Sequence, residues 1–390
     1  MNITETVCQL APEIMGIFEY LHAHPEISWQ ERNTTSYIED FLAAHSYKTI
    51  TFDDCTGVVG EIGEGGFTVA LRSDIDALWQ EVNGVFQANH SCGHDGHMTI
   101  ALGSLLVLSR MNYTPPGKLK AIFQPAEEKG TGALKMIEKH MLDDVDYLYG
   151  VHLRPNEEVK DRQAAPAIVH GAAQFLKGEI IGTDAHGARP HQGQNAIEIG
   201  AAFVGLLNSI HLNPSIPYSV KMTQFSAGGE SSNIIPGRAG FSLDLRAQTN
   251  EVMEQLVEQV KKIAAALAVV NGVEINLKPG ANVAAAVVNS QAQCFMESAI
   301  ADTLGAENVV PPVITTGGED FHFYTLKKPN IKATMLGLGC GLMPGLHHPE
   351  MTFNRETLLA GVEIMTKAIL ATFEHHREEC KNGSDNQIII

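Results

Sequence analysis

The sequence predicts an α/β fold with a smaller α+β domain inserted into it, and three observations support this prediction. The chain has 390 residues, more than one hydrophobic core usually supports. Strand-like and helix-like segments alternate up to about residue 155 and again after residue 285, as in a sheet covered by helices. Between them the order becomes strand–helix–strand–strand–helix–strand, the ferredoxin-like pattern. We therefore expect one domain from 1–176 plus 285–390 and an inserted domain from 177–284.

The larger domain is expected to begin with two helices and to continue as a sheet. Apolar residues recur at helical spacing over about 4–22 and 29–45. The segment 96–111 is apolar almost all round, which predicts a buried helix. Apolar runs predict strands at 56–63, 67–74, 117–125 and 146–155. After the insertion we expect a helix at 290–304, a strand at 331–339 and a helix at 355–376, with 381–390 as a frayed terminus or a small strand.

The inserted domain has four expected strands and two expected helices. The strands are expected at 175–183, 219–229, 239–247 and 272–280. The helices are expected at 195–210 and 250–270. Asn195 stands at the start of the first helix, where an asparagine side chain commonly caps the free backbone N–H groups.

Charge and cysteine content exclude some classes of function. The formal net charge is -18 and no dense Lys/Arg run occurs, so nothing indicates a nucleic-acid partner. The N-terminus predicts an amphipathic helix rather than a signal peptide, and no run of 18 apolar residues indicates a membrane span. The six cysteines are scattered without CxxC pairs. Free thiols in a reducing, cytoplasmic compartment are therefore expected.

The densest group of metal-binding residue types is HSCGHDGHM at 90–98, which follows an expected loop and opens the buried helix. Cys92 and His94 can both face one metal ion if the chain turns between them, and Gly93 permits that turn. A cysteine beside several histidines suits Zn, Mn, Co or Ni. The alternative is that the histidines only form local hydrogen bonds at a helix N-terminus.

Carboxylates follow two of the expected strands. Glu127 and Glu128 come at the end of one strand, where open α/β sheets place their sites. One carboxylate could bind a metal while its neighbour takes a proton from water, although adjacent acids are often only a solvated loop. Asp74 and Asp76 follow another strand and point to the same side of it. Their alternative role is to cap a following helix.

Two further histidines complete the set of possible ligands. His152 lies at the end of the strand YGVHLRP, and His347 precedes His348 and Pro349 in a late loop. Alone, each would more often be an ordinary surface or core histidine. Four strand-end loops and this late loop nevertheless each bring Cys, His or a carboxylate, about the number of ligands that two metal ions need.

These motifs resemble those of the aminoacylase and carboxypeptidase-type amidohydrolases, a family with hippurate hydrolases, indole-acetyl-amino-acid hydrolases and N-acetyl-diaminopimelate deacetylases. The similar segments run from HAHPEIS at 22–28 to LHHPEMTF at 346–353. Between them lie RSDIDAL, CGHDGH, FQPAEE, GVHLRP, HGARPHQG, NIIP and GGEDF. The resemblance implies a zinc-peptidase-like catalytic domain with an inserted lid domain that commonly mediates dimer formation.

The resemblance also assigns roles to residues. It implies that two divalent ions (Zn, Mn, Co or Ni) are bound by Cys92, His94, Glu128, His152 and His347. It makes Glu127 the general base. In the lid, it implies that His186 reaches across a dimer to the substrate carbonyl, and that Asn233 and Arg246 hold the substrate carboxylate. Without the resemblance, His186 would be an ordinary loop histidine and Arg246 an ion-pair partner of a nearby acid such as Asp244.

One departure from the family pattern concerns the pocket. The aspartate-rich motif usually continues with proline, whereas Leu78 is followed here by Trp79. Trp79 could reshape the pocket wall, so the preferred substrate does not follow from the resemblance.

We expect a homodimeric, metal-dependent amidohydrolase that cleaves the amide bond of small N-acyl amino acids with a metal-activated water. A dipeptidase or an N-acetyl-diaminopimelate-type deacetylase is an alternative with the same architecture. A catalytically silent metal-binding or regulatory protein is an alternative of another class. A thiol enzyme with Cys92 as nucleophile is a further alternative, and its activity would survive a chelator.

Overall fold

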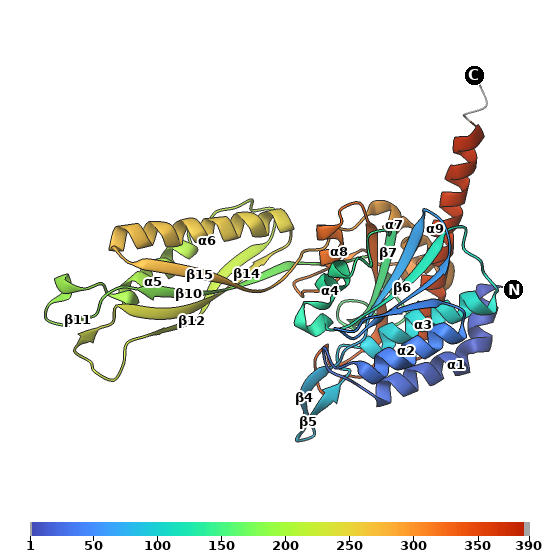
Figure 1. Ribbon diagram of the computed structural model, residues 1–390, viewed down its shortest axis with the longest axis horizontal. Helices are drawn as coiled ribbons and strands as arrows, with labels where there is room; N and C mark the ends of the chain where they lie inside the picture. The colour runs from blue at the N-terminus through green and yellow to red at the C-terminus, as the bar shows by residue number, and fades with distance from the viewer. Residues whose placement is uncertain (1, 386–390) are drawn as a thin grey trace. The chain divides into compact units, whose positions relative to one another are not determined.

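The computed structural model describes residues 2–385, which form two compact units (Figure 1). The first unit contains the chain up to Val169, Val287–Ile314 and the residues from Asp320 onward. The second contains His170–Ala286 and Thr315–Glu319. Each unit has its own cluster of buried apolar side chains.

A seven-stranded sheet lies in the first unit, in the order β1-β2-β6-β3-β7-β17-β8. Its strands are β1 (Lys48–Thr51), β2 (Val58–Gly63), β3 (Thr68–Asp74), β6 (Lys118–Gln124), β7 (Tyr147–Pro155), β8 (Ala164–Ala165) and β17 (Lys332–Leu342). The neighbours β6, β3, β7 and β17 are parallel. Their carboxyl ends therefore lie along one edge of the sheet, where such sheets bind ligands.

Helices pack on this sheet and confirm the predicted α/β class. They are α1 (Ile3–Ala23), α2 (Arg32–Ala44), α3 (His94–Arg110), α4 (Gly132–Glu138), α7 (Ser290–Leu304), α8 (His322–Lys327) and α9 (Thr357–Asp385). The helix α3 packs against α1, α9, β3 and β7. All its residues from His94 to Leu108 are buried, as its apolar sequence predicted.

The segment before His90 differs from the loop that the sequence suggested. It forms a β-hairpin of β4 (Leu78–Val82) and β5 (Val85–Asn89). The turn residues Asn83 and Gly84 both have positive φ, 52° and 81°, as the favoured two-residue hairpin turn requires. The structure therefore also excludes a helix capped by Asp76, because Asp76 leads into this hairpin.

The C-terminal helix is longer than predicted. α9 extends to Asp385, so 381–385 continue the helix rather than fray, and the remainder of that segment lies outside the described residues. Within residues 2–385, no helix combines the length and the hydropathy needed to cross a membrane.

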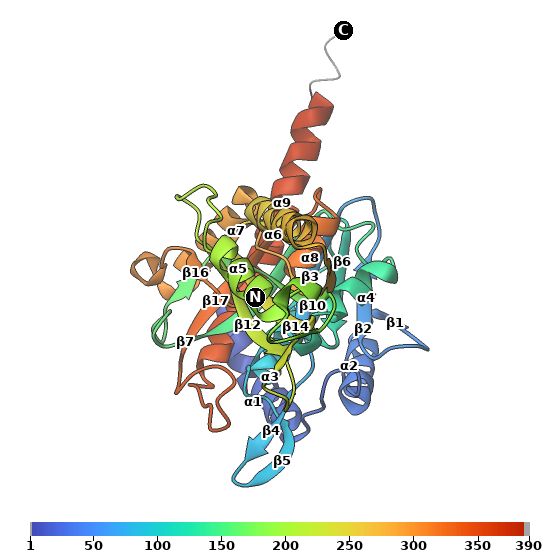
Figure 2. The ribbon, with the colours of Figure 1, turned by 90° about the vertical axis from the view of Figure 1, so that its left-hand side faces the viewer.

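The second unit has the predicted ferredoxin-like order. Its four-stranded antiparallel sheet is ordered β12-β14-β10-β15. The elements are β10 (Ala172–Ile181), α5 (Ala196–Leu207), β12 (Tyr218–Ala227), β14 (Arg238–Ala247), α6 (Asn250–Asn271) and β15 (Glu274–Val283). Figures 1 and 2 show α5 and α6 on the same side of this sheet. The side chain of Asn195 caps α5 by accepting the N–H of Ile197 at 3.1 Å, as expected.

Short strands complete the chain. Within the second unit, β11 (Ala185–His186) pairs with β13 (Ile234–Ile235). The strands β9 (Ile168–His170) and β16 (Val313–Thr315) form another two-stranded sheet.

Candidate metal centre

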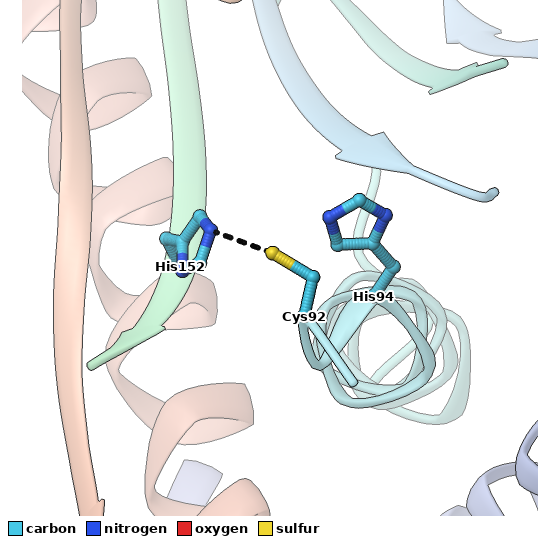
Figure 3. Close-up of side chains that lie close together, drawn as sticks. All are labelled: Cys92, His94 and His152. Atoms are coloured by element: carbon cyan, nitrogen blue, oxygen red, sulfur yellow. Dashed lines mark hydrogen bonds between the residues drawn. The ribbon is translucent and has the colours of Figure 1, made fainter. Parts of the chain in front are cut away.

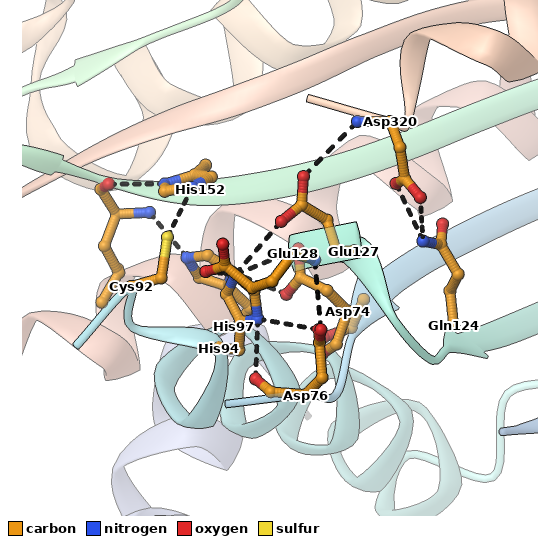
Figure 4. A network of polar contacts seen from close by, with 12 residues as sticks. Asp74, Asp76, Cys92, His94, His97, Gln124, Glu127, Glu128, His152 and Asp320 are labelled. Carbon is orange, nitrogen blue, oxygen red and sulfur yellow. Dashed lines mark hydrogen bonds and ion pairs between the residues drawn. The ribbon is translucent and has the colours of Figure 1, made fainter. Parts of the chain in front are cut away.

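The candidate ligands of the first unit meet at the carboxyl edge of its sheet, and Figure 4 shows four of them, Cys92, His94, Glu128 and His152. His152 lies on β7, and Glu128 lies in a 3-10 turn (Glu127–Lys129) that follows β6. Cys92 and His94 lie at the start of α3, where Gly93 has φ 86°. That positive φ needs a glycine and makes the turn that the sequence predicted.

The five proposed ligands form two groups that share Cys92. In each group the ligand atoms all lie within 4.8 Å of one another. The first group is Cys92, His94 and His152 (Figure 3), and the second is Cys92, Glu128 and His347. A shared thiol between two groups of ligands is the arrangement expected for two neighbouring ions.

His94 provides a direct test of whether a cation fits. Its Nδ1 donates a hydrogen bond to the backbone carbonyl of Asp76 at 2.8 Å, so Nε2 points into the site. Nε2 is buried and has no hydrogen-bond partner among the described residues. It lies 3.9 Å from a carboxylate oxygen of each of three residues, Asp74, Glu127 and Glu128. A buried nitrogen without a partner, facing three carboxylates at that distance, fits a position for a cation.

His152 is oriented in the same way. Its Nδ1 lies 2.7 Å from the carbonyl oxygen of Leu153 and therefore carries the proton. Nε2 is left facing Sγ of Cys92 at 3.7 Å (Figure 3). Burial lowers the pKa of His152 well below its usual value, with the neighbouring His97 acting in the same direction. His152 is therefore neutral, the form in which imidazole binds a metal.

The thiol and the other imidazole of this group are protonated when no metal is bound. Burial, with Glu128 adding to it, raises the pKa of the Cys92 thiol to about 12. Burial alone would lower the pKa of His94, but Asp74, Cys92 and a hydrogen bond with Asp76 raise it well above the usual value. A metal ion bound here must displace these protons.

Glu128 and His347 form the far side of the centre. Nε2 of His347 lies 3.4 Å from Oε1 of Glu128, and this nearby carboxylate raises the pKa of His347. The backbone N–H of Glu128 donates to Oδ2 of Asp76 at 3.1 Å. Asp76 thus contacts both His94 and Glu128 and orients two candidate ligands. The backbone N–H of Asp320 lies 3.4 Å from Oε1 of the neighbouring Glu127.

A buried polar network beneath the centre is not evident from the motifs. The guanidinium of Arg72 donates to Asp74 at 2.7 Å, to Asp320 at 2.8 Å and to Gln124 at 2.9 Å. His97 accepts the N–H of Leu153 through Nε2 at 2.9 Å and donates from Nδ1 to Asp74 at 2.8 Å. The sequence left the role of Asp74 open. In the structure, Asp74 joins Arg72 to His97 through these hydrogen bonds.

Glu31 is a functional candidate that sequence reasoning missed. It is fully buried, and its carboxylate accepts hydrogen bonds from the Thr56 hydroxyl at 2.6 Å and the Ala126 N–H at 2.8 Å. Ala126 has φ 52°, a left-handed conformation that costs a non-glycine residue energy. Glu31 therefore holds the strained residue that immediately precedes Glu127. No local signal marks this contact, which joins residues far apart in the sequence.

In the second unit, the structure brings His186 and Asn233 together. His186 lies on β11 opposite Ile234, and the carbonyl oxygen of Asn233 accepts the N–H of Gly187 at 2.7 Å. Both residues are exposed. Nδ1 of His186 accepts the N–H of Ala188 at 3.0 Å, which leaves Nε2 as the ring nitrogen that points away from this turn.

Arg246 is not brought together with these two residues. The β10–β14 register pairs Ile181 with Arg238 at the end of the sheet that leads to β11. Arg246 lies eight residues further along β14, roughly 25 Å away at strand spacing. Its Nε forms an ion pair with Asp244 at 2.8 Å, as the alternative interpretation predicted. It also lines a cavity of about 180 Å³ in this unit.

The chain is similar to known hydrolases over most of its length. Residues 70–371 match the model of peptidase family M20/M25/M40. The N-acetyl-L-cysteine deacetylase of Bacillus subtilis is 30% identical over 90% of this chain and 86% of that protein. The hippurate hydrolase of Campylobacter jejuni is 29% identical over 83% of this chain and 88% of that protein. The crystal structure of a dinuclear metal binding peptidase of Bacillus subtilis has a TM-score of 0.79 and 26% identity, with 93% of this chain and 98% of that chain covered.

Proposed function

Because the chain belongs to peptidase family M20/M25/M40, we propose that it is a metal-dependent amidohydrolase that cleaves the amide bond of small N-acyl amino acids. The observation that carries the proposal is the pair of ligand groups that share Cys92 beside Glu127. The named activities of the similar proteins support the substrate class, since a deacetylase of an N-acetyl amino acid and a hippurate hydrolase both cleave such amides.

We assign the metal ligands as the sequence proposed. Cys92, His94 and His152 would hold one ion, and Cys92, Glu128 and His347 the other. Two divalent ions supply Lewis acidity toward a water molecule and toward the amide carbonyl. One thiol among imidazoles and carboxylates suits zinc, manganese, cobalt or nickel.

Glu127 has the position of a general base. Its Oε2 lies 3.9 Å from Nε2 of His94, so its carboxylate borders the site without being one of the five assigned ligands. Glu127 takes a proton from the attacking water and returns it to the leaving nitrogen. Asp76, through its contacts with His94 and Glu128, keeps the surrounding side chains in place.

We further propose a homodimer in which the second unit acts as lid and dimerisation domain, with 177–284 as its proposed bounds. If His186, Asn233 and Arg246 all serve one substrate, the distance along β14 requires them to come from two chains. The exposed apolar side chains of α5 also support a dimer, since Ile197, Val204 and Leu206 are 48%, 40% and 40% exposed. His186 would then polarise the substrate carbonyl, and Asn233 and Arg246 would bind its carboxylate.

Scattered free cysteines support a cytoplasmic location.

The thiol-enzyme alternative is disfavoured by the state of its nucleophile. Burial raises the pKa of the Cys92 thiol to about 12. Catalytic cysteines require the opposite, a lowered pKa that makes the thiolate available near neutral pH. The silent-protein alternative is disfavoured because Glu127 and the candidate ligands are all present.

A substrate panel tests the proposed activity. Chelator-treated protein would be reloaded with Mn, Co, Ni or Zn and assayed with N-acetyl, N-benzoyl and N-indole-acetyl amino acids and with dipeptides. We expect metal-dependent release of free amino acid from at least one acylated substrate. Faster cleavage of dipeptides than of every acyl amino acid would favour the dipeptidase alternative.

A further inference from the structure

The backbone of His347 is held in a conformation that side-chain-bearing residues rarely adopt. Its φ is 63°, in the left-handed region. Such strain persists only where surrounding contacts enforce it, and it concentrates at functional sites. We therefore expect the neighbouring residues to make contacts that hold the backbone of His347 in this conformation.

Both polar groups of the His347 backbone are bound by the segment that contains the β4–β5 hairpin. The N–H donates to the carbonyl of Ser91 at 2.8 Å, and the carbonyl accepts from Nε2 of Gln80 at 3.0 Å. Asn89 completes the contact. Its Nδ2 donates to Oε1 of Gln80 at 2.8 Å and to the carbonyl of Pro349 at 3.0 Å. The two side-chain amides thus hold the loop at His347 and at Pro349.

The hairpin is joined to the candidate metal centre at both of its ends. β4 begins two residues after Asp76, which contacts His94 and Glu128, and β5 ends three residues before Cys92. Gln80 and Asn89 therefore tie His347 to the same backbone that carries Cys92. The other ligand group uses His152 on β7 and does not include the late loop.

We propose that Gln80 and Asn89 are positioning residues for His347, and that they set the affinity of only the ion held by Cys92, Glu128 and His347. This inference rests on the proposed metal-dependent function. Contacts that orient a metal ligand typically change metal affinity 10- to 100-fold, so about that loss is expected when one is removed. The ion held by Cys92, His94 and His152 should keep its affinity.

Calorimetric titration of metal-free protein with Mn²⁺ tests the proposal on four proteins: wild type, Gln80→Met, Asn89→Leu and the control Gln87→Met. Gln87 is the matched control because it lies directly opposite Gln80 in the hairpin and is exposed. In the first two variants we expect one of two binding steps to weaken about 10- to 100-fold with the other unchanged. Hydrogen exchange of the His347 amide in the metal-free protein should be faster in the same two variants.

The possible results separate this proposal from the proposed function. Two wild-type binding steps that stay unchanged in both variants, with unchanged exchange at His347, would overturn the positioning role and leave the hydrolase intact. Equal weakening of both steps would also overturn it, because the hairpin would then act on the whole centre. A wild-type protein that binds no divalent ion would overturn both proposals.

Discussion

At the scale of single residues, two histidines of the candidate centre are each fixed through one ring nitrogen. His94 and His152 use Nδ1 for backbone carbonyls and direct Nε2 inward. Glu127 borders this group but is not needed to complete either set of proposed ligands. In the proposed assignment, the residues that hold ions are therefore distinct from the residue that moves a proton, Glu127.

This separation predicts the effect of Glu127→Gln. The substitution keeps the size of the side chain but removes the base, so kcat should fall about 10²- to 10⁴-fold. Metal content, measured by mass spectrometry, should stay at the wild-type value. The comparison variant Glu128→Gln should instead lose metal, and near-normal turnover of Glu127→Gln would refute the assigned role.

The raised pKa of Cys92 predicts proton release when metal binds. A thiol with a pKa of about 12 is protonated at neutral pH, and a metal ligand must be the thiolate. Titration calorimetry in buffers of different ionisation enthalpy should detect the released proton. Cys92→Ala should release about one proton fewer than wild type.

Cys340 provides the matched control for this measurement. It is also buried with a pKa raised to about 12, but it belongs to none of the candidate metal groups of the described residues. Cys340→Ala should therefore release as many protons as wild type. An unchanged proton count in Cys92→Ala would contradict the thiolate ligand.

At the scale of elements, the sequence predicts the longer helices and strands well, but it predicts the contacts between them poorly. The strand ends with Asp74, Glu128 and His152 are predictable because parallel strands bring their carboxyl ends to one edge. The β4–β5 hairpin had a local signal, Asn83-Gly84, which the interpretation as a loop overlooked. No local sequence signal marked the contact of Glu31, because its partner Ala126 lies 95 residues away.

Glu31, which joins the start of α2 to the turn after β6, predicts a pH-dependent stability. In the metal-free protein, burial raises its pKa from 4.5 to about 7, and Asp76 adds to the effect. A raised folded-state pKa gives stability that is present below pH 4.5 and is lost as pH rises through 7. The loss should be about 3 kcal/mol at most, from the size of the shift.

Urea unfolding of metal-free protein between pH 4.5 and 8 measures this effect. Glu31→Gln should show a smaller decrease in the free energy of unfolding across that range than wild type. Asp40→Asn, an exposed acid on the same helix, should behave like wild type. Equal pH dependence of Glu31→Gln and wild type would show that Glu31 does not titrate in this range.

At the scale of the whole molecule, the sequence correctly predicts the ferredoxin-like order of the second unit but not the separation of its site residues. Asn233 and Arg246 were expected to hold one carboxylate. Within a chain, however, Arg246 lies roughly 25 Å along β14 from Arg238, the end of that strand which the chain enters after Asn233. The number of residues between Asn233 and Arg246 could not reveal this. A segment of 13 residues brings its two ends together if it folds as a turn, but separates them if it runs along one strand.

Complementation tests whether two chains share a site. His186→Ala and Arg246→Ala should each be nearly inactive alone. If His186 and Arg246 of one site come from different chains, each mixed dimer has one intact site. Co-expression in equal amounts should then recover about a quarter of wild-type activity. No recovery, in a mixture shown by sedimentation to contain mixed dimers, would contradict the shared site.

The most direct test of the metal centre is anomalous diffraction from crystals of the metal-loaded protein, recorded at the absorption edge of the bound metal. The account predicts two neighbouring peaks. One should be bounded by Cys92, His94 and His152, and the other by Cys92, Glu128 and His347. A protein active on an N-acyl amino acid that shows no peak at these side chains, or peaks only elsewhere, would contradict it.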